Sequence, residues 1–235
     1  YPGGSVRAIT NGFDRADLAE AIGREGPAGG VEEVCTFAAA GSFYGQRELA
    51  GLVEAIGLVL DRHPQWRGRV RLEVAGTLDG RQRRRWERER PAWMRLAGYL
   101  DHGAALRMIG ASACAVLIVP DCRHTRLCLP GKMFELTALP VHVLGLVPTG
   151  SETEKLLLEA GGCTVAAYED RGGTADAIER VIGEHFAGRL TGRRDWAALD
   201  RYDRRVLAGA WGECLVEVCA RRRGEVEIGE LRMEN

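Results

Sequence analysis

The chain has 235 residues, of which 46% are hydrophobic and 28% charged, as is ordinary for a globular protein. Its formal net charge of -1 argues against a general nucleic-acid-binding protein, which is usually strongly basic, so we expect no nucleic-acid partner. The apolar runs are far shorter than the roughly 20 residues of a membrane-spanning helix. Seven cysteines without a C-x-x-C pair indicate the reducing cytoplasm rather than a disulfide framework.

The sequence opens with Tyr1 rather than Met, and a strand-like "VRAIT" (6–10) is followed by "NGFD" (11–14). From this opening we expect the chain to be a piece of a longer protein in which another domain comes first. Residues 23–30, "GREGPAGG", are rich in Gly and Pro and predict a loop. We therefore assign residues 1–30 to an opening segment and linker.

From residue 31 to residue 190, strand-like and helix-like patterns alternate along the sequence. The expected strands are 34–40, 69–76, 93–100, 113–120, 141–147 and 163–168. The expected helices are 47–62, 81–90, 102–111, a short one that begins at "PGKMFE" (130–135), 151–161 and 174–187. This alternation predicts an α/β domain with right-handed crossovers and a Rossmann-like, doubly wound parallel sheet.

Glycines stand where several of the expected strands end. Ligands of doubly wound sheets bind outside the carboxyl ends of the strands, and Gly41, Gly76, Gly98 and the loop before Lys132 lie at such ends. A ligand site is therefore expected at this edge of the sheet.

Two motifs bring basic residues to this edge. In "GSFYGQRE" (41–48), glycines would let the backbone approach a phosphate closely, and Arg47 could pair with that phosphate. In "PGKMFE", Lys132 and Glu135 stand where a strand gives way to a helix. Glu135 could serve the helix dipole with Lys132 merely solvated, or both could belong to an anion site at a helix N-terminus. The residues alone leave both interpretations open.

Two further motifs are weaker. "RQRRRWERER" (81–90) holds six arginines against two glutamates, which is typical of a solvated helix face but could also attract an anionic membrane surface or a charged acceptor. "DCRHTRLC" offers Cys122, His124 and Cys128, a spacing that matches no common zinc pattern, so we expect no metal. The scattered histidines suggest no hydrolase triad.

The C-terminal part differs from the rest. Residues 196–219 read as one helical stretch whose apolar side would carry Trp196, Leu199, Tyr202, Val206, Leu207 and Leu215. We assign residues 191–235 to this helix and a charged tail.

Taken in order, these segments resemble the C-terminal, nucleotide-sugar-binding domain of GT-B-fold glycosyltransferases, most closely those of family 4 (group 1). "VRAITNGFD" is similar to the segment by which such enzymes begin their second domain, and "FAAAGSFYGQRELAGLVEAIGLVLDRHP" to their first strand, Gly loop and helix. "MRLAGYLDHGAALRMIGASACAVLIVP" resembles their base-binding turn, helix and strand, and "LPGKMFELTALPVHVLGLVPTGSETEKLLLEAGG" their donor-site helix and the pair beyond it. "DWAALDRYDRRVLAGAWGECL" resembles the terminal helix that crosses back toward the first domain. The likeness covers about residues 6–215.

The resemblance implies one half of a GT-B fold that binds a nucleotide-diphospho-sugar donor. Glu135 would hold the ribose hydroxyls, and Lys132 and Arg47 would contact the pyrophosphate. The full set of implied binding residues is Gly41, Ser42, Arg47, Gly98, Tyr99, Leu100, Gly131, Lys132 and Glu135, with the base held mainly by backbone groups at Gly98–Leu100. No cofactor and no metal are expected, and the catalytic residues and the acceptor are unknown.

Two departures from the family pattern leave the reaction open. Retaining members often carry a Glu eight residues before the position of Glu135, where this chain has Leu127, and "TALPVHV" (137–143) replaces the usual small-Gly-x-Pro-Val turn. The chain alone is expected to be inactive without its first domain. A nucleotide-sugar epimerase and a non-catalytic nucleotide-binding module are the alternatives. The expected location is cytoplasmic, with peripheral contact at the inner face of the membrane as a further expectation.

Overall fold

The computed structural model describes residues 6–22 and 33–223. Its centre is a six-stranded sheet in which every neighbouring pair is parallel, in the order β3-β2-β1-β4-β5-β6. The strands are β1 (Cys35–Phe43), β2 (Val70–Leu78), β3 (Met94–Gly98), β4 (Cys114–Ile118), β5 (His142–Val147) and β6 (Cys163–Ala167). This is the strand order of a doubly wound Rossmann sheet, so the predicted fold class is confirmed.

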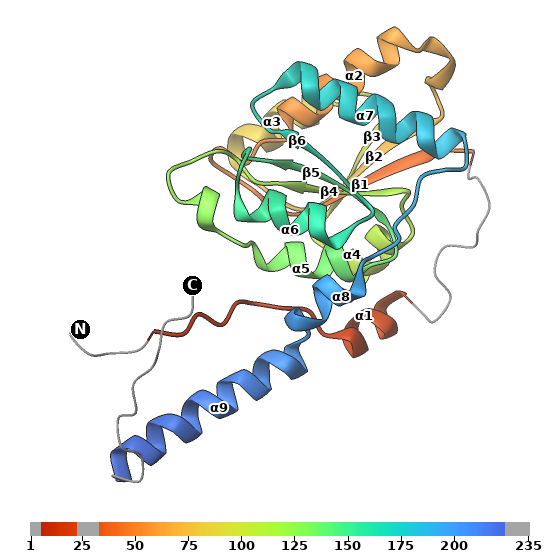
Figure 1. Ribbon diagram of the computed structural model, residues 1–235. Coiled ribbons are helices and arrows are strands. Elements are labelled where there is room, and N and C mark those ends of the chain that lie inside the picture. The colour runs from red at the N-terminus through yellow and green to blue at the C-terminus, as the bar shows by residue number, and fades with distance from the viewer. Residues whose placement is uncertain (1–5, 23–32, 224–235) are drawn as a thin grey trace.

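Helices cover both faces of the sheet (Figure 1). On one face lie α2 (Ala50–Arg62), α3 (Gly80–Glu89) and α7 (Arg171–Phe186). On the other lie α1 (Arg15–Ile22), α4 (His102–Gly110), α5 (Gly131–Ala138) and α6 (Glu152–Ala160). The chain continues through α8 (Trp196–Leu199) into α9 (Arg204–Arg223), and short 3-10 turns occur at η1 (Pro64–Trp66), η2 (Thr125–Leu127) and η3 (Asp200–Tyr202).

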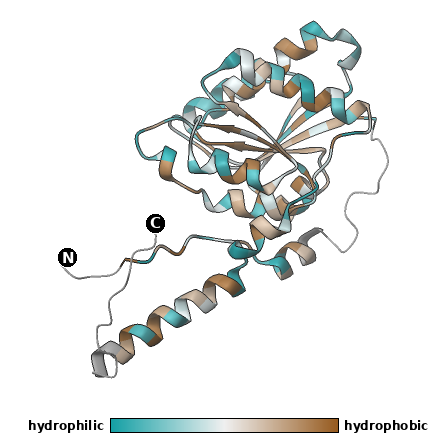
Figure 2. Ribbon diagram, in the orientation of Figure 1, coloured by the Kyte–Doolittle hydropathy of each residue, from teal (hydrophilic) through white to brown (hydrophobic). Residues whose placement is uncertain are grey.

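The central strands are apolar on both sides because each side meets a layer of helices. In β4, Val116 and Ile118 pack into the core under α2 and α7, whereas Ala115 and Leu117 pack into the core under α4 and α5. Figure 2 shows these middle strands in the brown of apolar residues. Two-sided burial is the physical reason for the continuous run "ACAVLIVP". Among the described residues, no helix has the length and apolarity needed to cross a membrane.

The opening segment differs from its expectation in two ways. Residues 6–12 form no strand, because they run beside α9, where Arg7 pairs with Glu213 and Glu217, rather than along the sheet. The regular pairing of the segment is a single parallel bridge between Phe13 and Asp203. The helix α1 then follows, capped by the Asp14 side chain, and the sequence pattern did not predict it. The expected loop at 23–30 lies outside the described residues.

The expected single helix over 196–219 is wrong, because the chain is interrupted at Asp203. This residue is extended, and the Phe13 carbonyl accepts the N–H of Arg204, so backbone pairing with the opening segment breaks the helix. Leu199 is fully buried, as expected of the apolar side, but Val206 and Leu215 of α9 are exposed. The charged tail after residue 223 lies outside the described residues, and the division at residues 30 and 190 stays a prediction.

Arg194 fastens the segment before α8 to the sheet. Its guanidinium is buried and donates to the carbonyls of Thr137, Leu136, Val141, Gly161 and Gly162. Five acceptors match the five N–H groups of an arginine side chain. Burial lowers the pKa of Arg194 from its ordinary value, and this full set of hydrogen bonds compensates the charge.

Candidate functional site

The sheet opens a crevice between β1 and β4, where its strand order reverses. After β1 the chain passes to α2 on one face, and after β4 it passes to α5 on the other. The first pocket in this crevice has a volume of about 370 Å³. It is lined by the end of β1 (40–43), Tyr44, Arg47, part of β4 (116–118), Pro130 and Lys132.

A second pocket of about 230 Å³ adjoins the first across the ends of β1 and β2. Here Gly41 and Gly76 lie opposite each other in the ladder. A Cβ atom added to Gly76, whose φ is +118°, would lie 1.8 Å from the Gly41 carbonyl oxygen. Only glycine permits this close approach, and the missing side chains leave the floor of the pocket open. Its lining also includes Ser42, Thr77, Tyr99, Leu100, His102 and Lys132.

The structure brings the predicted site residues to one edge of the sheet. Gly41, Ser42 and Lys132 line both pockets, so Lys132 stands where the two meet. Arg47 lines only the first pocket, and Tyr99 and Leu100 only the second, following Gly98 with its φ of +73°. Gly131 begins α5, and Glu135 lies one turn farther along that helix.

Glu135 lies between two basic side chains. Its Oε2 is 3.7 Å from Lys132 Nζ and its Oε1 is 3.7 Å from His102 Nε2. The glutamate side chain is 19% exposed, against 59% for His102, so the carboxylate lies deeper than the imidazole. His102 was not among the predicted residues, because an isolated histidine at the start of a helix gives no sequence signal.

The first turn of α5 lacks the features that the capping interpretation requires. Pro130 is the N-cap residue and offers no side-chain acceptor, and the first turn carries no acidic residue. Glu135 comes after that turn, where it cannot serve the free N–H groups of the helix start. The geometry therefore argues against helix capping as the role of Glu135, and the ligand interpretation stays a prediction.

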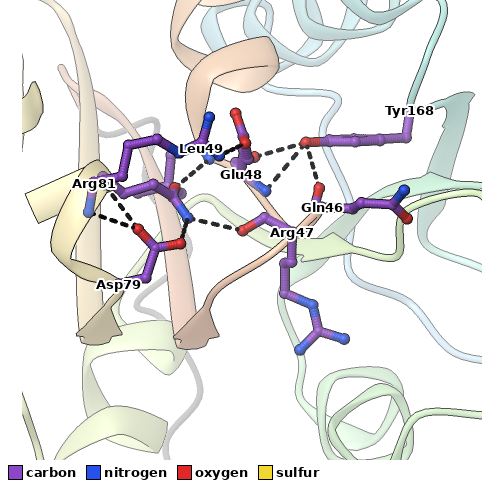
Figure 3. A network of polar contacts seen from close by, with 8 residues as sticks. Gln46, Arg47, Glu48, Leu49, Asp79, Arg81 and Tyr168 are labelled. Carbon is purple, nitrogen blue, oxygen red and sulfur yellow. Dashed lines mark hydrogen bonds and ion pairs between the residues drawn. The ribbon is translucent and has the colours of Figure 1, made fainter.

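Arg47 reaches into the first pocket. Its Nε atom is buried and has no hydrogen-bond partner among the described residues. In Figure 3 its side chain points away from the network around Gln46 and Glu48. A buried guanidinium nitrogen without a partner is costly unless a ligand supplies the acceptor. Arg47 Nε is thus a donor in this pocket that an anionic ligand could pair with.

Asn11 is a further neighbour of the crevice that sequence reasoning missed. A Cβ on Gly131 would lie 2.7 Å from Asn11 Nδ2, so the side-chain amide packs on the start of α5. Asn11 Oδ1 accepts the N–H of Gly12 at 2.9 Å. The motif "NGFD" was the available signal, but nothing in its spacing to residue 131 indicates this contact.

The side chains of the two weaker motifs, "RQRRRWERER" and "DCRHTRLC", make contacts within the protein. In α3, Arg81 pairs with Glu48, and Arg85 pairs with Glu54 and Glu89, which agrees with a solvated helix face. In the loop 121–130, the Thr125 hydroxyl accepts the Cys122 N–H. Within residues 6–22 and 33–223, no group of three or more His, Cys, Asp or Glu could hold a metal ion.

Leu127 lies in the turn before α5. Its side chain is 84% exposed in the 3-10 turn that precedes α5. The family pattern would place a glutamate at this point, and here it holds an apolar side chain. The chain therefore departs from the family pattern at this position.

Comparison with known proteins concerns the fold. No protein-family model matches the sequence, and no curated protein does either. A sucrose-phosphate synthase from Thermosynechococcus elongatus superposes with a TM-score of 0.66 at 15% identity, over 94% of this chain and 54% of that one. A UDP-forming alpha,alpha-trehalose-phosphate synthase from Burkholderia vietnamiensis gives 0.64 at 16% identity, over 91% and 52%. The protein described as trehalose-6-phosphate from E. coli, bound with UDP-2-fluoro glucose, gives 0.59 at 14% identity, over 88% and 50%.

The chain thus spans about half the length of the solved structures it matches. At these identities the likeness concerns the fold, and it agrees with the expected half of a GT-B architecture.

Proposed function

We propose that this chain is the donor-binding half of a glycosyltransferase, and that its crevice binds a nucleoside diphosphate sugar. The observation that carries the proposal is the pair of adjoining pockets that share Lys132, one containing Arg47 and the other lying beside Glu135. The pocket with Tyr99 suits a base and ribose, and the pocket with Arg47 suits two phosphates. Solved structures of the same fold include UDP-forming synthases and one bound with a UDP sugar, which supports this ligand class.

The proposed chemistry is electrostatic. When the bond between sugar and phosphate breaks, negative charge grows on the departing diphosphate. Arg47, Lys132 and the free N–H groups at the start of α5 are fixed in place to stabilise that charge. No metal is required for this role, because the cations are supplied by side chains. The acceptor and the residues that activate it would belong to a first half of the protein, so we expect no transfer by this chain alone.

The test is calorimetric titration of the chain with nucleoside diphosphates of the five common bases and with the corresponding nucleosides. We expect one base to be preferred and its diphosphate to bind at least about tenfold more tightly than its nucleoside, as charged hydrogen bonds to the phosphates would give. Lys132→Met should remove most of that difference. The sequence contains one other lysine, Lys155 on α6, which pairs with Glu152, so Lys155→Met is the matched control.

Two results would contradict the proposal. Equal affinity for the diphosphate and the nucleoside would mean that the pocket with Arg47 does not bind the phosphates. Binding that Lys132→Met and Lys155→Met weaken equally would mean that the effect is one of net charge.

Peripheral membrane contact and a cytoplasmic location stay predictions. Arg83 and Arg84 on the outer side of α3 are exposed and could meet an anionic surface. Sedimentation with vesicles of phosphatidylcholine, with and without phosphatidylserine, would test the contact, with Arg83→Gln/Arg84→Gln as the comparison.

A further inference from the structure

The loop that carries Arg47 is held by side chains from two distant elements. The loop (44–49) connects β1 to α2, and α2 receives no hydrogen bond from a side chain of its own N-cap residue, Leu49. Within the loop, the Arg47 N–H donates to the Tyr44 carbonyl at 3.1 Å. The Glu48 N–H also donates to the Gln46 carbonyl, at 3.0 Å. Both contacts lie within the loop and do not fix it against the sheet. Further backbone groups of the loop bind the side chains of Gln82 and Tyr168. Figure 3 shows the contacts of Tyr168 with the loop.

Gln82 of α3 binds the loop on both sides of Glu48. Its Oε1 accepts the Leu49 N–H at 3.1 Å, and its Nε2 donates to the Arg47 carbonyl at 3.2 Å. The residue is only 3% exposed, which is unusual for a glutamine. Asp79, the N-cap of α3, accepts the backbone N–H of Gln82 at 2.9 Å and fixes its position. The carbonyl of Arg47 is therefore tied to a buried and fully oriented amide.

Tyr168 binds the same loop from the opposite direction. It follows β6, at the far end of the sheet from α3, and its ring lies against Gly51 of α2. Its hydroxyl accepts the Glu48 N–H at 3.2 Å and lies 3.2 Å and 3.0 Å from the carbonyl oxygens of Gln46 and Glu48. Burial raises the pKa of Tyr168 above its ordinary value, so the hydroxyl keeps its proton at neutral pH.

We propose that Gln82 and Tyr168 are positioning residues that hold Arg47 in the phosphate pocket. This inference rests on the proposed function, since it needs Arg47 to contact the diphosphate. Both side chains bind the backbone around Arg47 rather than its guanidinium, which stays directed into the pocket. A loop fixed before the ligand arrives need not be ordered on binding, so affinity for the phosphates rises without a further contact. Neither residue touches the ligand.

The experiment compares dissociation constants for the preferred nucleoside diphosphate and its nucleoside in five variants. These are Arg47→Met, Tyr168→Phe, Gln82→Met, and the last two each combined with Arg47→Met. We expect Arg47→Met to weaken diphosphate binding by about tenfold to a hundredfold, as loss of a charged hydrogen bond suggests. Tyr168→Phe and Gln82→Met should each weaken it by about threefold to tenfold, because a mobile loop presents Arg47 only part of the time.

The affinity for the nucleoside distinguishes a loss of phosphate contacts from a general structural effect, which would weaken the binding of both ligands. We expect its affinity to change by less than about twofold in all variants, since Arg47 lies in the other pocket. In the Arg47→Met background, Tyr168→Phe and Gln82→Met should have no further effect on the diphosphate, because they act through Arg47. The matched controls are Tyr202→Phe and Gln65→Met, which make the same changes away from this loop and should leave both affinities unchanged.

The outcomes separate the two proposals. If Arg47→Met leaves diphosphate affinity unchanged, the phosphate pocket itself is wrong and the inference fails with it. If Arg47→Met weakens binding but the other two variants do not, the pocket stands and the positioning role is overturned. The positioning role is also overturned if Tyr168→Phe or Gln82→Met weakens nucleoside and diphosphate equally, or retains its full effect without Arg47.

Discussion

Lys132 Nζ lies 3.7 Å from Glu135 Oε2, one turn away on α5, so the two charged residues of "PGKMFE" form an ion pair at the mouth of the crevice. The pair is partly exposed, with 31% of the lysine side chain and 19% of the glutamate side chain accessible. Pairs of this kind contribute only about 0–1 kcal/mol to stability. The two charges are therefore available to a ligand at little cost to the fold.

We predict that Glu135→Gln weakens nucleoside diphosphate binding by about 1.5–3 kcal/mol, because a carboxylate that accepts two ribose hydroxyls makes charged hydrogen bonds. Stability should change by at most about 1 kcal/mol. Titrations and melting curves on the same variant measure both quantities. Glu152→Gln is the matched control, since Glu152 forms the equivalent pair with Lys155 on α6. Unchanged affinity with a lowered melting temperature would mean that Glu135 has a purely structural role.

We predict that nucleotide binding does not depend on a divalent metal. Arg47, Lys132 and the start of α5 could neutralise the two phosphates, and the sequence has no Asp-x-Asp motif. Calorimetry with a chelator and with magnesium should give similar affinities. A gain of tenfold or more with magnesium would count against the proposed arrangement of cations.

We predict that Gly76→Ala destabilises the protein and weakens nucleotide binding. The new Cβ would meet the Gly41 carbonyl, and backbone strain at this positive φ alone costs about 1–3 kcal/mol. Gly57→Ala is the control, because Gly57 lies within α2 with nothing within 4 Å of an added Cβ. That change should stabilise the helix by roughly 0.5–1 kcal/mol. Equal melting temperatures for the two variants would mean that the β1–β2 approach is not rigid.

We predict that His142 makes stability fall as the solution becomes acidic. Burial lowers the pKa of His142 below its ordinary value of 6.5, and its Nε2 accepts from the Thr164 hydroxyl at 2.9 Å while its Nδ1 faces the Thr191 carbonyl. Below about pH 6.5 the unfolded chain binds a proton at this histidine that the folded chain does not, so stability is lost as pH falls from there toward the folded pKa.

Denaturant midpoints at pH 7.5 and 5.5 test this expectation. Wild type should lose more stability between the two pH values than His142→Gln, in which the carboxylates still titrate but this histidine is absent. Identical losses in the two proteins would contradict the assignment.

The sheet was predictable because its periodicity is strong. Runs such as "ACAVLIVP" have one physical explanation, which is burial on both faces. The glycines of β1 and β2 did not mark the strand ends correctly, because these strands continue two residues past Gly41 and Gly76, to Phe43 and Leu78. The predicted site also came from topology, since the carboxyl ends of parallel strands meet at one edge. Residues separated by almost a hundred positions, such as Ser42 and Lys132, could therefore be grouped in advance. Whether they bind a nucleotide stays a prediction.

What sequence patterns missed depends on contacts between distant segments. The break at Asp203 follows from pairing with Phe13, which no local propensity reveals. Asn11 lies against Gly131, and His102 lies beside Glu135, only in the assembled fold. Gln82 stands within the arginine-rich motif "RQRRRWERER" and Tyr168 in a turn after β6. That both side chains bind the same loop is visible only when the elements that flank α2 are assembled.

Arg194 has a consequence for the order in which the protein folds. Its carbonyl acceptors precede it by 32 to 58 residues in the sequence, and they belong to the end of α5, the start of β5 and the α6–β6 turn. These five hydrogen bonds can form only after that part of the sheet exists, so we expect them to be absent from the folding transition state. Arg194→Met should then speed unfolding and leave the folding rate nearly unchanged in stopped-flow experiments. Arg194 would then contribute to the kinetic stability of the domain. It would determine how long the folded state lasts rather than how quickly that state is reached.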